Sequence, residues 1–171
     1  MIVRLPSDAM VVLIGPSGSG KSTFATRHFL PTQVLSSDAL RALVADDAND
    51  QTATDAAFEL LHTALAMRLA RRRLTVVDAT SVEAWARQKL LAVARRLGRP
   101  AAAIVFNVPL ETCLERNAAR TDRRLPSTAI RRQHARMLAS LEGLAAEGFD
   151  PIAVLGTTEA VETTTVAPGD R

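Results

Sequence analysis

The chain has 171 residues, of which 47% are apolar and 4% aromatic, and it carries a net charge of +3. This length suits one domain with a substantial core, and the apolar content excludes a disordered chain. We expect a cytoplasmic protein without a membrane partner, because no apolar run approaches the ~20 residues of a spanning helix and no signal peptide is recognisable. The single cysteine, Cys113, excludes an internal disulfide.

Apolar runs and amphipathic helical patterns alternate along the chain. The apolar runs predict strands at 10–14, 34–36, 74–78, 102–108 and 152–155. Helical patterns follow the first run and cover 54–72 and 82–97, the last with a capping box formed by Thr80 and Glu83. This order predicts an α/β fold, in which helix layers cover both faces of a mostly parallel sheet. The carboxyl ends of such strands share one edge, where ligands bind.

Two segments interrupt the alternation. Residues 46–55 are acidic and polar, and they predict a loop or lid. Residues 157–171 are rich in threonine and predict a frayed tail or linker, so the folded domain is expected to span 1–156. Among the aromatic residues, Phe58 and Trp85 are expected in the core.

The segment GPSGSGKS, residues 15–22, matches the pattern G-x-x-x-x-G-K-[ST] between a predicted strand and a helix. Its glycines let backbone N–H groups converge on phosphate oxygens, and the helix N-terminus adds positive charge. Lys21 is expected to reach the β- and γ-phosphates of ATP or another nucleoside triphosphate, and the Ser22 hydroxyl to ligate Mg²⁺. The predicted donor site comprises Gly15, Ser17, Gly18, Ser19, Gly20, Lys21, Ser22 and Thr23, with Arg116 and Arg123 from a later segment.

A carboxylate closes the predicted strand at 74–78. Asp78 resembles the second acidic position of P-loop proteins, which holds Mg²⁺ or its water, and it is therefore the other predicted metal residue. The alternative is structural, because Asp78 also stands where a helix N-cap belongs.

A kinase that phosphorylates a hydroxyl needs a base beyond the γ-phosphate. Asp38 follows the second predicted strand, at the same sheet edge as the glycine-rich motif, and can accept the hydroxyl proton. Arg41, one helical turn later, can keep Asp38 ionised and aimed, or contact an acceptor phosphate. In the alternative, Asp38 only caps the next helix and Arg41 is solvated.

Arginines gather between residues 116 and 136. Arg116 and Arg120 share a helix face at i, i+4, and Arg123 lies one turn further if the helix continues. Residues 125–127 then begin another helix. Two helices joined at an arginine-rich corner predict a lid at about 110–140 that neutralises a transferring phosphoryl group, although a solvated basic helix is the alternative. The predicted catalytic residues are Lys21, Asp38, Arg41, Arg116, Arg120 and Arg123.

These stretches together resemble the 5′-kinase module of bacterial polynucleotide kinase-phosphatase, an RNA-repair end-healing enzyme. The similar stretches are GPSGSGKSTFA (15–25), VLSSDALR (34–41), LVADDANDQTAT (43–54), LTVVDATSV (74–82), AIVFNVP (103–109) and CLERNAARTDRR (113–124). They extend over the chain from about residue 8 to about residue 156. The similarity is more specific than a phosphate-binding loop, because DDANDQTAT and RNAARTDR are not generic phosphate-binding sequences.

The resemblance implies a three-layer αβα P-loop kinase fold with an arginine-rich helical lid. It also implies an activity, in which the γ-phosphate of ATP or another nucleoside triphosphate moves, with Mg²⁺, to the 5′-OH end of RNA or DNA. Asp38 would then be the general base beside Arg41. In that family phosphatase and ligase-like modules follow the kinase, so they are the expected partners in the same or a larger polypeptide. Ser81 stands where the family has asparagine.

Two other hypotheses stay open. A small-molecule P-loop kinase, of the gluconate-kinase or antibiotic-phosphotransferase type, would work in a closed pocket without an oligonucleotide. A non-catalytic nucleotide-binding module that regulates partner modules would bind ATP without transferring its phosphate.

Overall fold

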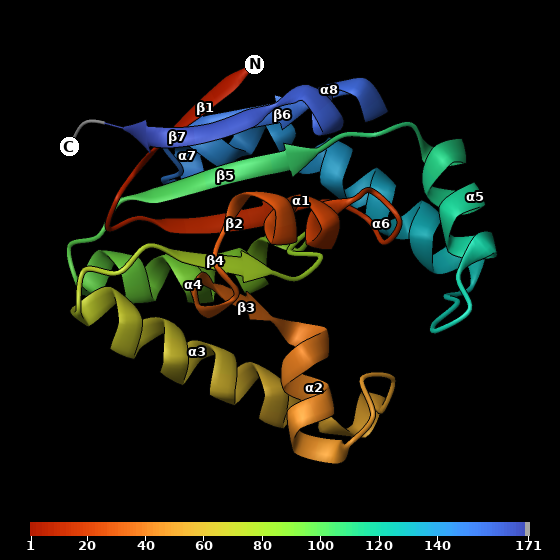
Figure 1. Ribbon diagram of the computed structural model, residues 1–171, viewed down its shortest axis with the longest axis horizontal. Coiled ribbons are helices and arrows are strands. Elements are labelled where there is room, and N and C mark those ends of the chain that lie inside the picture. Colours follow the sequence, from red (N-terminus) through yellow and green to blue (C-terminus); the bar gives the residue numbers. More distant parts are fainter. Residues whose placement is uncertain (170–171) are drawn as a thin grey trace.

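The computed structural model describes residues 1–169 and is built on one five-stranded sheet. Its strand pairs are parallel and follow the order β3-β4-β2-β5-β6 (Figure 1). The strands are β2 (Met10–Ile14), β3 (Val34–Ser36), β4 (Thr75–Asp78), β5 (Ala101–Phe106) and β6 (Ile152–Leu155). All five predicted strands are thus confirmed, with small shifts at their ends.

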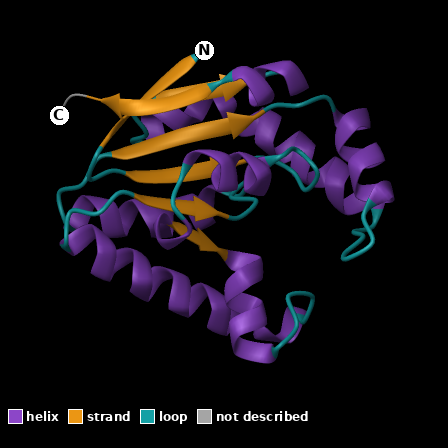
Figure 2. Ribbon diagram, in the orientation of Figure 1, coloured by secondary structure: helices purple, strands orange, loops and turns teal. Residues whose placement is uncertain are grey.

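Helices cover both faces of this sheet (Figure 2), which confirms the predicted three-layer α/β fold. The helices are α1 (Lys21–His28), α2 (Ser37–Ala45), α3 (Thr54–Ala70), α4 (Ala84–Arg96), α5 (Leu110–Ala119), α6 (Ser127–Ser140), α7 (Leu144–Glu147) and α8 (Thr158–Thr163). The described residues also form short 3₁₀ turns, η1 (Pro31–Gln33) before β3, η2 (Gln51–Ala53) between α2 and α3, and η3 (Leu141–Gly143) between α6 and α7. Because every main-sheet pair is parallel, the strand carboxyl ends and the helices that follow them share one edge.

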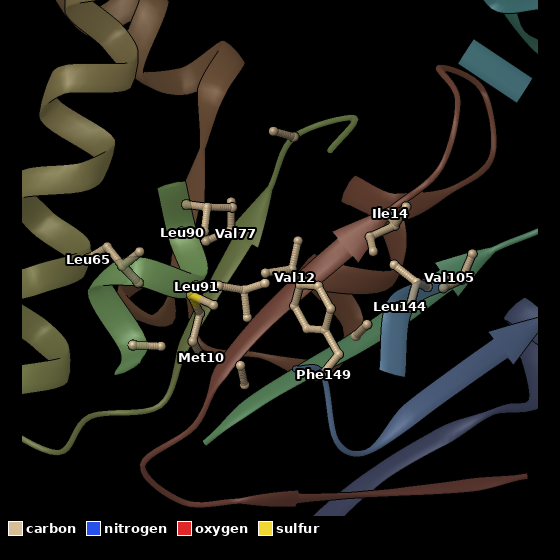
Figure 3. Close-up of a cluster of buried hydrophobic side chains, with 14 of the residues drawn as sticks. Met10, Val12, Ile14, Leu65, Val77, Leu90, Leu91, Val105, Leu144 and Phe149 are labelled. Atoms are coloured by element: carbon tan, nitrogen blue, oxygen red, sulfur yellow. The ribbon is translucent and has the colours of Figure 1, made fainter. Parts of the chain in front are cut away.

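The two faces of the sheet carry separate cores. Alternate residues of β2 point to opposite faces, so Met10, Val12 and Ile14 pack with α3, α4 and α7, whereas Val11 and Leu13 pack with α1, α5 and α8. In the first core, Leu90 and Leu91 of α4, Leu144 of α7 and the nearby Phe149 converge on β2 and β5 (Figure 3). These buried contacts make the β2–β4–β5 centre a rigid support for the loops at the carboxyl edge.

The C-terminal segment is folded, contrary to the prediction of a frayed tail from residue 157. Helix α8 buries Val161, and β7 (Thr165–Gly169) pairs in parallel with β1 (Ile2–Pro6) to form a second, two-stranded sheet. The prediction was wrong because threonine-rich sequence can form a strand when a partner is present, and that partner lies at the opposite end of the chain. Residues 170 and 171 of the predicted tail lie outside the described residues.

Two local predictions were also wrong. Helix α4 begins after Glu83, with no side-chain cap, so Thr80 and Glu83 do not form the expected capping box. Trp85 is 63% exposed instead of buried, and the Lys89 ammonium lies over its ring, 5.1 Å from the centroid. Among the described residues, the helices are all too short or too polar to cross a membrane.

Candidate active site

The glycine-rich segment forms a loop between β2 and α1 at the carboxyl edge of the sheet (Figure 1). The Gly15 N–H donates to the Thr80 carbonyl over 3.0 Å, which ties the start of the loop to the segment between β4 and α4. Gly18 has a φ of 83°, and a Cβ there would lie 2.5 Å from the Cys113 carbonyl oxygen. A side chain at Gly18 would therefore both strain the backbone and push α5 away from the loop.

Lys21 opens α1 and folds back over the loop. Its Nζ donates to the Gly15 and Pro16 carbonyls over 2.9 and 2.8 Å. Burial lowers the pKa of Lys21 to about 8, and the charge of Asp78 only partly opposes this shift. A buried ammonium with a lowered pKa gains strongly from an added anion, which is what a phosphate-binding lysine requires.

This pKa predicts how donor affinity depends on pH. The charged form of Lys21 is the one expected to bind a triphosphate, and the free protein loses that charge above pH about 8. The affinity for Mg²⁺·ATP should therefore be full below pH 8 and fall above it, by up to about tenfold per pH unit. Titration calorimetry between pH 7 and pH 9.5 measures this change. Lys21→Met should bind weakly with little pH dependence in that range, and parallel profiles for both proteins would contradict the assignment.

Ser22 and Asp78 suit a magnesium ion. Asp78 ends β4 and is buried in the wall of the cleft, and Ser22 lies in the first turn of α1. Burial raises the pKa of Asp78, while the nearby Ser22 hydroxyl and the Lys21 charge lower it. Mg²⁺ commonly takes one or two protein oxygens and completes its shell with water and phosphate, so these two groups fit it. Asp78 is a strand residue and not a helix cap, since α4 begins after Glu83.

Asp38 lies in the first turn of α2, directly after β3. Its Oδ1 accepts hydrogen bonds from Arg41 over 2.7 Å and from Arg123 over 2.8 Å. The cap of this helix is Ser36, whose hydroxyl accepts the Ala39 N–H, so the alternative in which Asp38 serves as the cap is wrong. The Asp38 side chain is 46% exposed, which leaves its carboxylate accessible to a hydroxyl group in the cleft.

Arg41 is buried and therefore not the solvated residue of the alternative hypothesis. Besides Asp38, it donates to the Ala48 carbonyl over 2.7 Å, which fastens the loop between α2 and α3. The Asn49 amide of that loop reaches the Asp122 carbonyl over 3.4 Å. The acidic segment at 46–55 thus meets the arginine-rich corner at one side of the cleft.

The arginine-rich corner is not one continuous helix face. Helix α5 ends at Ala119, and Arg120 leaves it with an extended backbone and pairs in a fork with Asp122. Arg116 points to the phosphate-binding loop, 3.5 Å from the Gly18 carbonyl, whereas Arg123 crosses to Asp38. Arg116 and Arg120 therefore do not share a helix face, and the helix does not continue to Arg123. The predicted pair of helices joined at an arginine-rich corner is present as α5 and α6, and all three arginines line the same cleft.

This cleft has a volume of about 560 Å³ and runs between the glycine-rich loop, β4, α2 and the corner. It brings together most of the predicted site, while Gly15 and Ser19 are buried behind the loop surface. The residues from the predicted site that line it are Ser17, Gly18, Gly20, Lys21, Ser22, Thr23, Asp38, Arg41, Asp78, Arg116, Arg120 and Arg123.

Some residues that line the cleft belong to no sequence motif, so the sequence analysis did not predict them. The Gln133 side-chain oxygen on α6 accepts the Ser17 N–H over 2.9 Å, so it holds the tip of the loop from a distance of 116 positions in the sequence. Phe58 of α3 was expected only in the core, but it also forms part of the cleft wall. A lone glutamine on a polar helix gives no signal in the sequence, because its role depends on how α6 packs.

The fold and the phosphate-binding loop define a nucleotide-binding protein of the P-loop kinase superfamily. A family model described as an AAA domain, AAA_33, matches residues 10–144, and the chain belongs to this family. No curated protein sequence matches the chain significantly.

Solved structures share this fold at low sequence identity. A chain of the Pnkp1/Rnl/Hen1 RNA repair complex is similar with a TM-score of 0.68 and 21% identity over 81% of this chain, which spans only 46% of that one. The tunicamycin resistance protein of Deinococcus radiodurans has a TM-score of 0.58 and 17% identity, over 97% of this chain and 100% of its own. A gluconokinase from Sinorhizobium meliloti 1021 has a TM-score of 0.55 and 20% identity, over 92% of this chain and 90% of its own. At such identities the similarities establish the fold and not the substrate.

Proposed function

We propose that the protein is a polynucleotide 5′-hydroxyl kinase that uses ATP or another nucleoside triphosphate. The observation that carries the proposal is the position of Asp38. This partly exposed carboxylate shares a cleft with Lys21 and Ser22, and two arginines hold its Oδ1. A switch or motor would need no base on the acceptor side of a phosphate-binding loop, whereas a kinase that acts on a hydroxyl does.

In the proposed reaction the acceptor hydroxyl oxygen bonds to the γ-phosphorus while the bond from that phosphorus to the β–γ bridging oxygen breaks. Asp38 takes the hydroxyl proton, and Arg41 keeps the carboxylate aimed. Lys21, which donates to the Pro16 carbonyl, and Arg116, which donates to the Gly18 carbonyl, would contact the phosphates. Mg²⁺, held by Ser22 and Asp78, would neutralise charge on the β- and γ-phosphate oxygens.

The identity of the acceptor rests on the specific sequence resemblance. The DDANDQTAT and RNAARTDR stretches meet through Asn49 and Asp122 at one side of the cleft, and both contribute residues to its lining. The similarity in fold to a chain of an RNA repair complex agrees with this acceptor. Because the present chain spans less than half of that one, phosphatase and ligase modules are proposed partners, in the same or a larger polypeptide.

A small-molecule kinase is the second candidate. The tunicamycin resistance protein and the gluconokinase are each similar in fold over at least 90% of both chains, a larger share than the 81% of this chain that matches the RNA-repair chain. The same Asp38 and Lys21 would then act on a sugar or antibiotic hydroxyl. The two candidates differ in the acceptor and not in the chemistry.

One assay separates these candidates. The protein is incubated with γ-labelled ATP and Mg²⁺, and with either a 5′-OH oligonucleotide, gluconate, tunicamycin or a nucleoside. We expect label on the oligonucleotide, and more slowly or not at all on the small acceptors. Label on a small acceptor alone would establish the second candidate. ATP binding without transfer to any acceptor would point to a non-catalytic module.

Oligonucleotide binding should also depend on salt. Lysine and arginine contacts to backbone phosphates release counterions, so the affinity should fall between 50 and 200 mM salt, by about tenfold or more for a few contacts. Fluorescence anisotropy with a labelled 5′-OH oligonucleotide measures this slope. A flat response would contradict a groove that follows a nucleic-acid backbone.

A further inference from the structure

A buried ion pair lies outside the cleft, between α4 and α7. The Arg87 side chain is completely buried, and it binds the Glu147 carboxylate in a fork, with Nε to Oε2 at 2.7 Å and Nη2 to Oε1 at 2.5 Å. Neither residue lines the cleft, and the proposed reaction uses neither. Burying an arginine to this degree is costly in free energy, because its charge is removed from water, so its hydrogen-bond partners must compensate for that cost.

The third nitrogen of this guanidinium points toward the site. Arg87 Nη1 donates to the Ser81 carbonyl over 3.0 Å. Ser81 has a φ of 49°, in the left-handed region that side-chain-bearing residues rarely adopt. A backbone in this region persists only where its surroundings hold it, and Arg87 holds Ser81 directly.

The loop around Ser81 is connected to the donor site through backbone groups. Thr80, next to Ser81, accepts the Gly15 N–H through its carbonyl, and Asp78 precedes it by two residues. The contacts therefore run from Glu147 through Arg87 and the β4–α4 loop to the first residue of the phosphate-binding loop. A shift of this loop would move both Gly15 and Asp78.

The outer end of this chain of contacts is anchored in the core. Leu90 and Leu91 of α4, with Leu144 of α7 and Phe149, pack on the central strands (Figure 3). Arg95 of α4 also donates to the Glu147 backbone carbonyl. Glu147 is thus fixed to α4 at two points, and it presents a rigid carboxylate to Arg87.

We propose that Arg87 and Glu147 form a positioning pair that sets the β4–α4 loop, and through it the geometry of the phosphate-binding loop and the magnesium position. This inference rests on the donor half of the proposed function and is independent of the acceptor. An apolar pair of similar volume would fill the same space, but it would lack the directional bond to the Ser81 carbonyl. Replacing a buried ion pair by packed apolar residues often preserves stability, so stability and positioning can be separated.

The test compares Arg87→Met/Glu147→Met with the wild-type protein. Thermal unfolding reports stability, and titration with ATP at several Mg²⁺ concentrations reports the donor site. We expect the double variant to unfold near the wild-type temperature, to bind Mg²⁺·ATP about tenfold more weakly, and to need more Mg²⁺ for half-maximal binding, because misplaced supporting groups loosen a site. Arg96→Met, an exposed arginine on the same helix, is the matched control and should change none of these quantities.

A second variant keeps the test decisive if the double variant fails to fold. Arg87→Lys retains the charge and one contact to Glu147, but it cannot bind Glu147 in a fork and reach Ser81 at the same time. Hydrogen exchange of the Gly15 amide should be faster in Arg87→Lys, together with weaker Mg²⁺·ATP binding. A folded variant with wild-type ATP affinity, magnesium dependence and Gly15 exchange would overturn the proposal. Absence of kinase activity on any acceptor would not, since every readout concerns the donor.

Discussion

Asp38→Asn should lower the rate of phosphoryl transfer by about 10²–10⁴-fold, the usual contribution of a general base. The substitution preserves the size of the side chain and removes its ability to take a proton. Binding of Mg²⁺·ATP should change little, because Asp38 contacts Arg41 and Arg123 and no residue of the phosphate-binding loop. Single-turnover transfer from γ-labelled ATP, measured beside ATP affinity, tests both expectations.

The control for this experiment is Asp55→Asn. Asp55 is an exposed aspartate in the first turn of α3, and it does not line the cleft. The Asp55→Asn variant should transfer phosphate at the wild-type rate. The base assignment is wrong if Asp38→Asn transfers phosphate as fast as this control, or if it loses ATP binding to the same extent as transfer.

Arg123→Ala should reduce transfer further, by about 10³–10⁵-fold, the value of one well-placed arginine at a transferring phosphoryl group. Arg123 lies at the arginine-rich corner, lines the cleft and reaches Asp38 across it. Its charge lies beside the proposed base, in the cleft that Lys21 also lines, and can stabilise the charge that develops during transfer. The loss should appear mainly in kcat, because the donor loop keeps its own contacts.

Arg124→Ala is the matched control for Arg123. Arg124 is exposed, donates to the Arg120 carbonyl and does not line the cleft. Arg123→Lys distinguishes charge from geometry, since lysine restores the charge without the planar fork of donors. Equal rates for Arg123→Ala and Arg124→Ala would show that the corner serves only as a solvated surface.

The relation of Arg123 to Asp38 adds a constraint on these two results. Both Arg41 and Arg123 donate to the same oxygen, Oδ1 of Asp38. Because Arg123 binds Asp38 directly, the effects of Asp38→Asn and Arg123→Ala should not be additive. The double variant should lose less transfer activity than the product of the two single losses. Strict additivity would argue that the two side chains act on separate steps.

Much of the fold follows from local sequence patterns. Continuous apolar runs such as Met10–Ile14 and Ala101–Phe106 are buried on both faces of a parallel sheet, so they are recognisable without knowledge of their neighbours. The pairing of β1 with β7 was not foreseen, since each strand needs a partner from the other end of the chain. Trp85 was placed wrongly because an aromatic residue near a helix start gives no sign of which side faces water.

The residues of the candidate site also fall into two groups, those that local sequence predicts and those that only the tertiary structure brings together. By itself the sequence determined the phosphate-binding loop, because its glycines, Lys21 and Ser22 are neighbours whose geometry follows from the turn between one strand and one helix. It also indicated Asp38, which stands at the end of a strand on the same sheet edge. Only the tertiary structure decided that Arg123 reaches Asp38, that Gln133 holds Ser17 and that Arg87 supports Ser81. Such contacts join residues far apart in the chain, and their distances depend on how whole helices pack on the sheet.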